Sequence, residues 1–348
     1  MNRKSKWVIA LLTAALLCGC SASDDLGSDS SSQTQTAAPA VTLPSDSHES
    51  EADSSSQTNE SEADAAEITP AMWLVTSPDG DTMYMMGSMH ALKEECYPLP
   101  DYVTDAYESA DILAVECDIA DSSKSVSAAL KYTDKLTYPS GETIADHISS
   151  KAYDGISSYL AYMGDDISNY EIYQTWYLSS LLESIALSDS GLDSSLGFDM
   201  QLLTMAHKDD KEIYEVESME LQYEMLIGFS DEIYDLTFLS YSEESADEIK
   251  QEYIDLYEAW KSGDTDAVEE LNTADLSEMS DEQVEIYEEY NQKLLYDRNE
   301  AMALTAQELF SEDEQVLFVV GEAHFLGDGG ILDLLEEDGY EVERVQAY

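Results

Sequence analysis

Two histidines, one near each end of the chain, follow a glycine at the same spacing. Gly87 precedes His90 and Gly321 precedes His324, each within an aromatic-apolar-apolar-Gly-x-x-His pattern. Neutral imidazole is a common ligand of transition metals. A lone histidine is more often a hydrogen-bonded core or loop residue, but the repetition favours a shared metal site.

Each histidine motif is expected to connect a strand to a helix. After each motif come a loop, a helical stretch (residues 102–109 and 330–337) and a short strand-like run (residues 112–116 and 341–345). The chain therefore contains two related strand–GxxH–helix–strand units. Parallel strands of such units end at the same edge of a sheet, where open α/β sheets bind ligands. The motif glycines suit a sharp turn or a close backbone approach at that edge.

Glu116 is expected at the same edge, because it ends the apolar run of residues 112–115. A carboxylate buried there without a partner would be costly. A cation removes that cost, so the sequence predicts a divalent metal ion, with Mn, Co and Zn as candidates, held by His90, Glu116 and His324. Such an ion would activate water for hydrolysis, which makes Glu116 a catalytic candidate as well.

Arg298 is a further catalytic candidate. It falls in a helix predicted over residues 280–310, which begins with the capping-box pair Ser280 and Gln283. Its neighbours three and four residues away include no acidic side chain, so Arg298 is expected to point inward and bind a carboxylate, an anionic substrate group or a developing oxyanion. The alternative is an arginine that reaches solvent at the edge of the domain. Asn299 could reach the same region.

Three acidic residues are weaker candidates. Glu217 ends a strand predicted over residues 213–216 and could relay a proton during catalysis. Glu220 and Asp199 could contact the substrate or support the metal ligands. The alternative for Glu217 and Glu220 is a solvated surface in so acidic a chain, and for Asp199 it is a helix N-cap.

The N-terminal segment is typical of a bacterial lipoprotein. A cationic start is followed by an apolar stretch, residues 7–17, that is too short to span a membrane comfortably. The stretch ends in Leu-Cys-Gly-Cys at residues 17–20, which resembles the lipobox that marks a cysteine for lipidation. Residues 1–19 are therefore predicted to be a signal peptide and Cys20 the lipidated mature N-terminus, with a plain secretory signal as the alternative.

The next segment has the composition of a disordered tether. Residues 20–67 are acidic and rich in Ser and contain no aromatic residue, so they cannot bury enough apolar surface to offset the entropy of ordering. Residues 68–348 follow without a Pro-, Gly- or Ser-rich break and are predicted to form a single domain. These features predict a domain on the outer face of the bacterial cell membrane, attached only by its lipid anchor.

Composition narrows the partners further. The chain has 75 acidic and 15 basic residues and a formal net charge of −60. Such a charge disfavours nucleic acid and bare anionic lipid, and solubility is its simplest explanation. Cys96 and Cys117 lie within the predicted domain, where they would form a disulfide or pack as small buried hydrophobic residues.

Two further stretches, residues 170–187 and 244–261, are helical in period and rich in Tyr and Trp, which are interpreted as core residues. The sequence therefore predicts an α/β (α+β) fold. Its central sheet is built from the two related units, with a large helical insertion between them.

In this order, the motifs resemble the TraB/PrgY/GumN family of metal-dependent hydrolases over residues 68–348. The matching segments are residues 71–75, 87–90, 97–100, 115–118, 197–199, 216–222, 298–299, 320–327 and 339–340. The chain departs from the family pattern at Ala91, Leu92 and Cys117, none of which is a proposed ligand. The resemblance implies kinship with Tiki-type metalloproteases, which use paired Gly-x-x-His motifs and a glutamate, and with plasmid-encoded pheromone-shutdown proteins.

The sequence thus predicts a surface-anchored, metal-dependent hydrolase, specifically a peptidase that cleaves extracellular peptides or proteins with a metal-activated water. The alternative is a lipoprotein that binds and sequesters a secreted peptide signal without cutting it. A hydrolase of non-peptide esters is a third interpretation.

Overall fold

A computed structural model describes residues 68–310 and 314–346 of the chain. The predicted signal peptide, the lipidation site Cys20 and the predicted tether lie outside the described residues. Within the described part, no helix is both long enough and apolar enough to cross a membrane.

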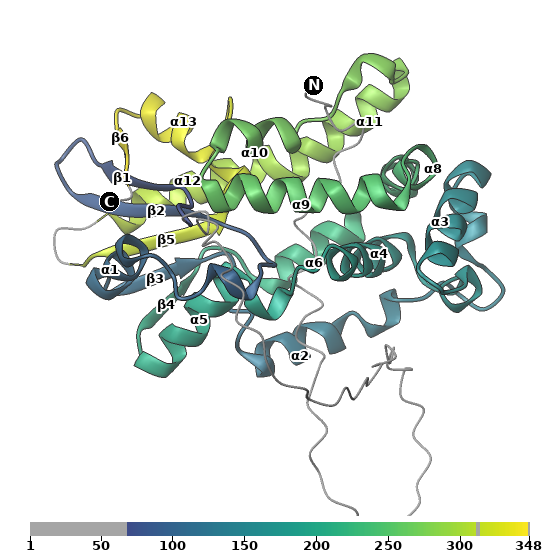
Figure 1. The fold of residues 1–348 in the computed structure, drawn as a ribbon, viewed down its shortest axis with the longest axis horizontal. Coiled ribbons are helices and arrows are strands. Elements are labelled where there is room, and N and C mark those ends of the chain that lie inside the picture. The colour runs from purple at the N-terminus through teal and green to yellow at the C-terminus, as the bar shows by residue number, and fades with distance from the viewer. Residues whose placement is uncertain (1–67, 311–313, 347–348) are drawn as a thin grey trace, which may run out of the picture. The chain divides into compact units, whose positions relative to one another are not determined.

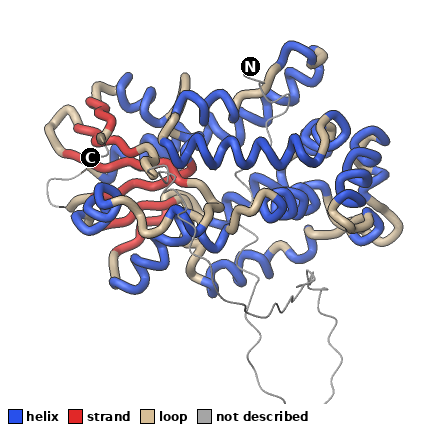
Figure 2. The backbone as a smooth tube through the Cα atoms, in the orientation of Figure 1, coloured by secondary structure: helices blue, strands red, loops and turns tan. Residues whose placement is uncertain are grey.

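A mixed six-stranded sheet forms the centre of the fold, with strand order β4-β3-β5-β2-β1-β6 (Figures 1 and 2). The strands are β1 (Met72–Thr76), β2 (Thr82–Ser88), β3 (Ile112–Val115), β4 (Glu212–Glu215), β5 (Val316–Gly321) and β6 (Glu341–Arg344). Strands β2, β5, β3 and β4 run parallel to one another, whereas β1 is antiparallel to both of its neighbours, β2 and β6. Every residue of β3 and β5 is buried, as expected for central parallel strands that are covered on both faces.

Alternating side chains of these strands build two separate cores. On one face, residues such as Leu113 and Val319 pack with α1 (Asp101–Ser109) and α5 (Phe198–Asp209). On the other face, residues such as Ala114 and Phe318 pack with α12 (Asp297–Leu309) and α13 (Ile331–Glu337). The sheet is therefore the middle layer of an α/β/α arrangement, which confirms the predicted mixed α and β fold class.

The strands that follow each histidine motif interleave in the sheet. The chain runs from β2 through α1 to β3, but β5 lies between β2 and β3. It later runs from β5 through α13 to β6, with β2 and β1 in between. As a result β2 and β5 are direct neighbours, although more than two hundred residues separate them in the sequence.

Most of the chain between β3 and β5 is helical. Its helices are α2 (Ser122–Lys131), α3 (Ser150–Tyr162), α4 (Thr175–Asp189), α5, α6 (Met219–Gly228), α7 (Asp231–Phe238), α8 (Ser240–Glu243), α9 (Ala246–Ser262), α10 (Thr265–Leu271), α11 (Asp281–Asn291) and α12. Short 3₁₀ turns occur at Glu94–Cys96, Thr133–Lys135, Ile144–Asp146, Ile167–Asn169, Ser194–Leu196, Leu276–Glu278 and Glu322–His324. Figure 1 shows α3 and α8 well away from the strands.

Aromatic residues hold this helical region together, as predicted. Trp176, Tyr253, Tyr257 and Trp260 are buried. Trp260 also donates a hydrogen bond from its indole N–H to the backbone oxygen of Gly87 at 2.9 Å, which ties α9 to the first histidine motif.

Two helices differ from their predicted extents. The helix predicted from residue 170 begins at Thr175, because Tyr173 instead forms a β-bridge with Thr137. The helix predicted over residues 280–310 starts with the expected capping box, but a π-helical segment, Gln292–Tyr296, separates α11 from α12. Both Cys96 and Cys117 are buried free thiols, so they form no disulfide.

The close fit of the two motifs generates a stability prediction. A Cβ on Gly87 would lie 2.5 Å from the Cβ and Cγ atoms of Glu322, which real structures do not tolerate. We expect Gly87→Ala to lower the free energy of unfolding by about 1–3 kcal/mol, the usual cost of overpacking. Denaturant unfolding would measure it.

Gly228→Ala is the matched control, because a Cβ at Gly228 meets no atom within 4 Å and this residue lies in a helix. It should leave stability unchanged or raise it slightly. Equal stability of the two variants would show that the motifs do not pack as described.

Candidate functional site

The two histidine loops leave the sheet side by side. Strands β2 and β5 pair in parallel, with Gly87 opposite Val320 and Ser88 opposite Gly321. His90 and His324 each lie three residues after the glycine of their motif. The structure therefore brings the two loops to one edge of the sheet, at the carboxyl ends of parallel strands.

His324 is fully buried and has a defined tautomer. The side-chain amide of Asn299 donates to the backbone oxygen of Gly329 at 3.0 Å, which leaves the Asn299 oxygen facing the ring. That oxygen lies 2.6 Å from Nδ1 of His324, so Nδ1 carries the proton and donates it. The lone pair is then on Nε2, which is buried and has no hydrogen-bond partner among the described residues.

The charge state of His324 agrees with this tautomer. Burial lowers the pKa of His324 well below its usual value, and the positive charges of Arg298 and His90 act in the same direction. The imidazole is therefore neutral at neutral pH. A neutral imidazole with a free Nε2 is the form that binds metal ions.

His90 is held by a carboxylate. Its Nδ1 lies 2.8 Å from Oδ2 of Asp199, and both side chains are nearly buried. Burial alone would lower the pKa of His90, but the charge and hydrogen bond of Asp199, together with Glu116 and Glu183, raise it to about 9. Asp199 thereby fixes the ring orientation and directs Nε2 away from itself.

The first turn of α5 brings Asp199 to the histidine. The backbone N–H of Phe198 donates to the oxygen of Met89 at 2.9 Å. A Cβ on Gly197 would lie 2.3 Å from the backbone oxygen of His90, so only glycine permits this approach. The Gly-Phe-Asp segment noted in the sequence is therefore the element that docks α5 against the first histidine loop.

Glu116 lies at the end of β3, but its carboxylate is fully engaged. Oε1 accepts from the backbone N–H of Gly321 at 2.7 Å. Oε2 accepts from the Arg298 guanidinium at 2.9 Å and from the Gln222 amide at 3.0 Å. One motif glycine thus offers a backbone donor to Glu116, whereas the other, Gly87, makes room for Glu322.

Arg298 joins two carboxylates in a buried network. It donates to both oxygens of Glu217 at 2.7 Å, in a bidentate pair, as well as to Glu116. Its remaining Nη1 donates to the backbone oxygen of Leu294 within the π-helical segment. Arg298 is only 6% exposed, in agreement with the inward direction that its apolar helical neighbours predicted.

The predicted three-ligand set is therefore not formed in this structure. In residues 68–310 and 314–346, no group of three His, Cys, Asp or Glu side chains is arranged to hold a metal ion. The physical reason is that Glu116 is turned into the network with Arg298, which satisfies both of its oxygens. The two imidazoles fit metal binding, because each ring is held through Nδ1 in the way typical of metal-binding histidines.

The weaker candidates separate into two groups. Glu217, Asp199 and Asn299 lie in the site and contact Arg298, His90 and His324, respectively. Glu220 does not, because α6 turns Met219 and Gln222 inward and leaves Glu220 exposed. It lines a separate surface pocket with Ser123, Lys124 and Ser127.

Glu322 was not singled out from the sequence, and it is the most unusual carboxyl group near the site. It is 4% exposed, and neither of its oxygens has a hydrogen-bond partner among the described residues. Burial raises the pKa of Glu322 to about 8, and Arg344 offsets only part of that effect. Its position inside the second Gly-x-x-His motif is the feature of the sequence that could have identified Glu322 as a site residue.

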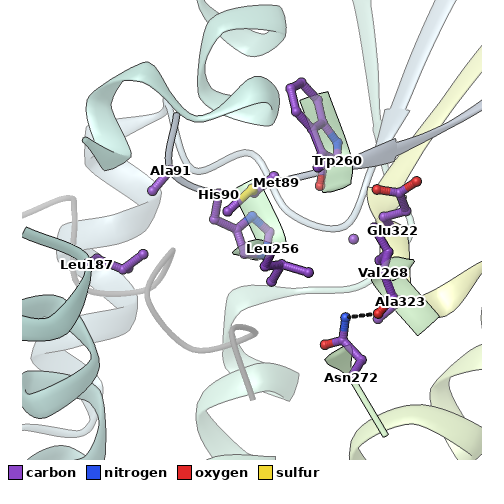
Figure 3. Close-up of a pocket in the computed structure, with 12 residues that line it drawn as sticks. Met89, His90, Ala91, Leu187, Leu256, Trp260, Val268, Asn272, Glu322 and Ala323 are labelled. Atoms are coloured by element: carbon purple, nitrogen blue, oxygen red, sulfur yellow. Dashed lines mark hydrogen bonds between the residues drawn. The ribbon is translucent and has the colours of Figure 1, made fainter. Parts of the chain in front are cut away.

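A small pocket opens beside His90 (Figure 3). It has a volume of about 50 Å³. The lining residues are Ser88, Met89, His90, Ala91, Leu187, Leu256, Trp260, Val268, Asn272, Gly321, Glu322 and Ala323. The pocket therefore lies where both histidine motifs meet helices α4, α9 and α10.

The sequence matches a known family. A model of the TraB/PrgY/gumN family matches residues 71–344. This match covers most of the chain, so the protein belongs to the TraB/PrgY/gumN family.

Curated relatives include a bacterial protein and animal metalloproteases. The uncharacterized protein YbaP of Escherichia coli is 26% identical over 157 residues, which is 45% of this chain and 56% of YbaP. Metalloprotease TIKI1 of Danio rerio is 22% identical over 307 residues, 76% of this chain and 61% of TIKI1. Metalloprotease TIKI2 of Xenopus tropicalis is 40% identical over 68 residues, 19% of this chain and 13% of TIKI2.

The chain thus spans little more than half the length of YbaP. No solved structure matches it.

The buried ion network generates a second stability prediction. Arg298→Met would leave Glu116 and Glu217 buried without their cation, so we expect a loss of about 3–5 kcal/mol in the free energy of unfolding. Chemical denaturation at neutral pH would measure it. Lys293→Met is the control, because Lys293 pairs with Glu289 on an exposed helix face, where such a pair contributes less than about 1 kcal/mol.

A loss for Arg298→Met no larger than that for Lys293→Met would contradict the network. It would mean that the two glutamates do not depend on the guanidinium.

Proposed function

We propose that this protein is a metal-dependent hydrolase that cleaves extracellular peptides, with His90 and His324 as ligands of one divalent ion. The observation that carries the proposal is the paired imidazoles at one sheet edge, each fixed through Nδ1, with His324 Nε2 buried and without a donor among the described residues. A buried polar atom normally has a hydrogen-bond partner, and one that lacks a protein partner is a candidate to bind a water molecule or an ion.

Local charge supports a cation at this place. Once His90 gives up its proton, Asp199, Glu116 and Glu217 carry three formal negative charges around the histidines, against the single positive charge of Arg298. The electrostatic effect is visible in the raised pKa of His90. A divalent cation at the imidazoles would balance the excess and displace the proton from His90.

When bound, the ion would supply Lewis acidity, which polarises a carbonyl group and makes water a better nucleophile at neutral pH. Two protein ligands leave coordination positions open for substrate and water, the hallmark of catalytic rather than structural metal sites. Imidazole donors suit a transition metal such as Zn, whereas Mn prefers oxygen ligands; Zn, Co and Mn remain the candidates.

The other residues would position these groups. Asp199 and Asn299 hold the two rings in the tautomer that presents Nε2. Arg298 holds Glu116 against Gly321, the glycine of the second motif, and so fixes that loop relative to β3. Because four of its five N–H groups already donate to protein acceptors, Arg298 acts in this proposal through Glu116 and Glu217.

The choice of a peptide substrate rests on the relatives and on the leader. The TIKI relatives are named metalloproteases. The predicted signal peptide and Cys20 would place the domain on the outer face of the cell membrane. Secreted peptides and proteins are the substrates with amide bonds that it would meet there. The competing proposal, a binding protein that sequesters such a peptide, uses the same site without cleavage.

Metal binding tests the site itself. Calorimetric titration of the metal-free protein with Zn²⁺ or Mn²⁺ should show one tight site, and His324→Ala should weaken it by at least about 10–100-fold, since even an outer partner of a metal ligand contributes that much. His207→Ala is the matched control, because His207 is a half-exposed histidine that contacts Asp118.

Peptide cleavage tests the reaction. Incubation with a peptide mixture should give products in a chelator-sensitive manner, and His90→Ala should abolish them. Cleavage by His90→Ala at the wild-type rate would refute the proposal. Intact peptide recovered in stoichiometric amount from a metal-loaded protein would favour sequestration instead.

Anchoring has its own test. Mass spectrometry of the mature protein from a bacterial membrane should find an N-terminal, lipidated Cys20, and Cys20→Ala should leave the chain unlipidated. A mature chain that begins elsewhere would contradict the lipid anchor.

A further inference from the structure

We propose that the pocket beside His90 receives a small aliphatic side chain of the substrate, from the residue next to the bond that is cleaved. This inference rests on the proposed function and adds the substrate preference. His90, one of the two proposed metal ligands, also forms part of the pocket wall. A side chain in the pocket therefore belongs to a residue close to the reacting carbonyl group.

The wall of the pocket is apolar. Leu187, Leu256, Val268 and Trp260 come from three different helices, α4, α9 and α10, and all four are buried. Met89, Ala91 and Ala323 add apolar surface from the histidine loops. Figure 3 shows His90 and Leu256 near one another, with Glu322 and Ala323 across the pocket.

Two polar side chains, Asn272 and Glu322, also line the pocket. The Asn272 side-chain amide donates to the backbone oxygen of Val268 at 2.8 Å, within its own helix. Both oxygens of Glu322 are buried and have no hydrogen-bond partner among the described residues. A charged side chain would lose its hydration against the mostly apolar wall, whereas an aliphatic one would gain by leaving water.

The size of the pocket restricts the aliphatic group. An apolar cavity of about 150 Å³ accommodates a benzene ring. At about 50 Å³ the pocket beside His90 has a third of that space. It is suited to the side chain of alanine or valine and excludes Phe, Tyr and Trp.

In this assignment the sheet and the helical insertion have different roles in the site. The sheet edge supplies the histidines, and the helical insertion supplies the pocket wall through α4, α9 and α10. The indole of Trp260 joins the two parts, since it lines the pocket and donates to Gly87. Changes in the insertion would therefore alter substrate preference without touching the histidines.

The test is a cleavage profile over a peptide library that varies one position at a time, with metal-loaded full-length protein. For the wild type we expect a clear preference for Ala or Val at one position beside the cleaved bond, against Phe and Lys there. Leu256→Ala and Val268→Ala should each shift that preference toward Leu or Phe, by about 10–200-fold in the ratio of kcat/KM values, the range for a changed hydrophobic pocket.

Leu236→Ala is the matched control. Leu236 is equally buried but packs with Ala274 and Tyr287 in a separate cluster, so this variant should keep the wild-type profile. Leu256→Ala and Val268→Ala lie in different helices, so the test can still be made if one of them fails to fold. The wild-type cleavage profile tests the expected preference for Ala or Val without any variant.

The outcomes separate the two proposals. If the wild type cleaves no peptide, the proposed function fails. If it cleaves but prefers aromatic or basic residues at every position near the bond, or if Leu256→Ala and Val268→Ala leave the preference unchanged, the pocket assignment is overturned while the hydrolase stands.

Discussion

The parallel pairing of β2 with β5 is the contact on which the site depends. It sets Ser88 opposite Gly321 and so brings together two loops from opposite ends of the domain. Gly87 permits this closeness, because Glu322 packs where its side chain would be. If the register slipped by one residue, the side chains of one strand would turn to the other face of the sheet, and the histidines would separate.

Buried charge is the second constraint. Two carboxylates and a guanidinium share the interior beside the histidines, and the guanidinium donates hydrogen bonds to both carboxylates. Desolvating such groups is expensive, and removing one member leaves the rest without compensation. The same network holds the second histidine loop through the Gly321 N–H, so the electrostatics and the geometry of the site are coupled.

Much of the site was predictable from the sequence because it lies at strand ends. The duplicated motif predicted β2 and β5, and the apolar run before Glu116 predicted β3. Burial of Arg298 followed from its apolar neighbours one turn away. The periodicity of apolar residues shows which face of a helix or strand is buried. Arg298 lies on such a face, and Glu116 follows an apolar run.

The partners of these residues were not predictable in the same way. The periodicity of the sequence does not show that Glu116 pairs with Arg298, because that contact depends on how β3 and α12 pack against each other. The π-helical segment and the interleaved order of the strands are likewise tertiary outcomes. The aromatic helices were predicted as core, but their contribution of a pocket wall beside His90 appears only when α4, α9 and α10 meet the loops.

The most direct test of the central claim is a crystal structure of the protein grown with Zn²⁺ and measured at the metal absorption edge. The account predicts one anomalous peak at the carboxyl ends of β2 and β5, about 2.0–2.1 Å from Nε2 of both His90 and His324. An ion bound through only one of these rings, or bound elsewhere while both stay free, would contradict it.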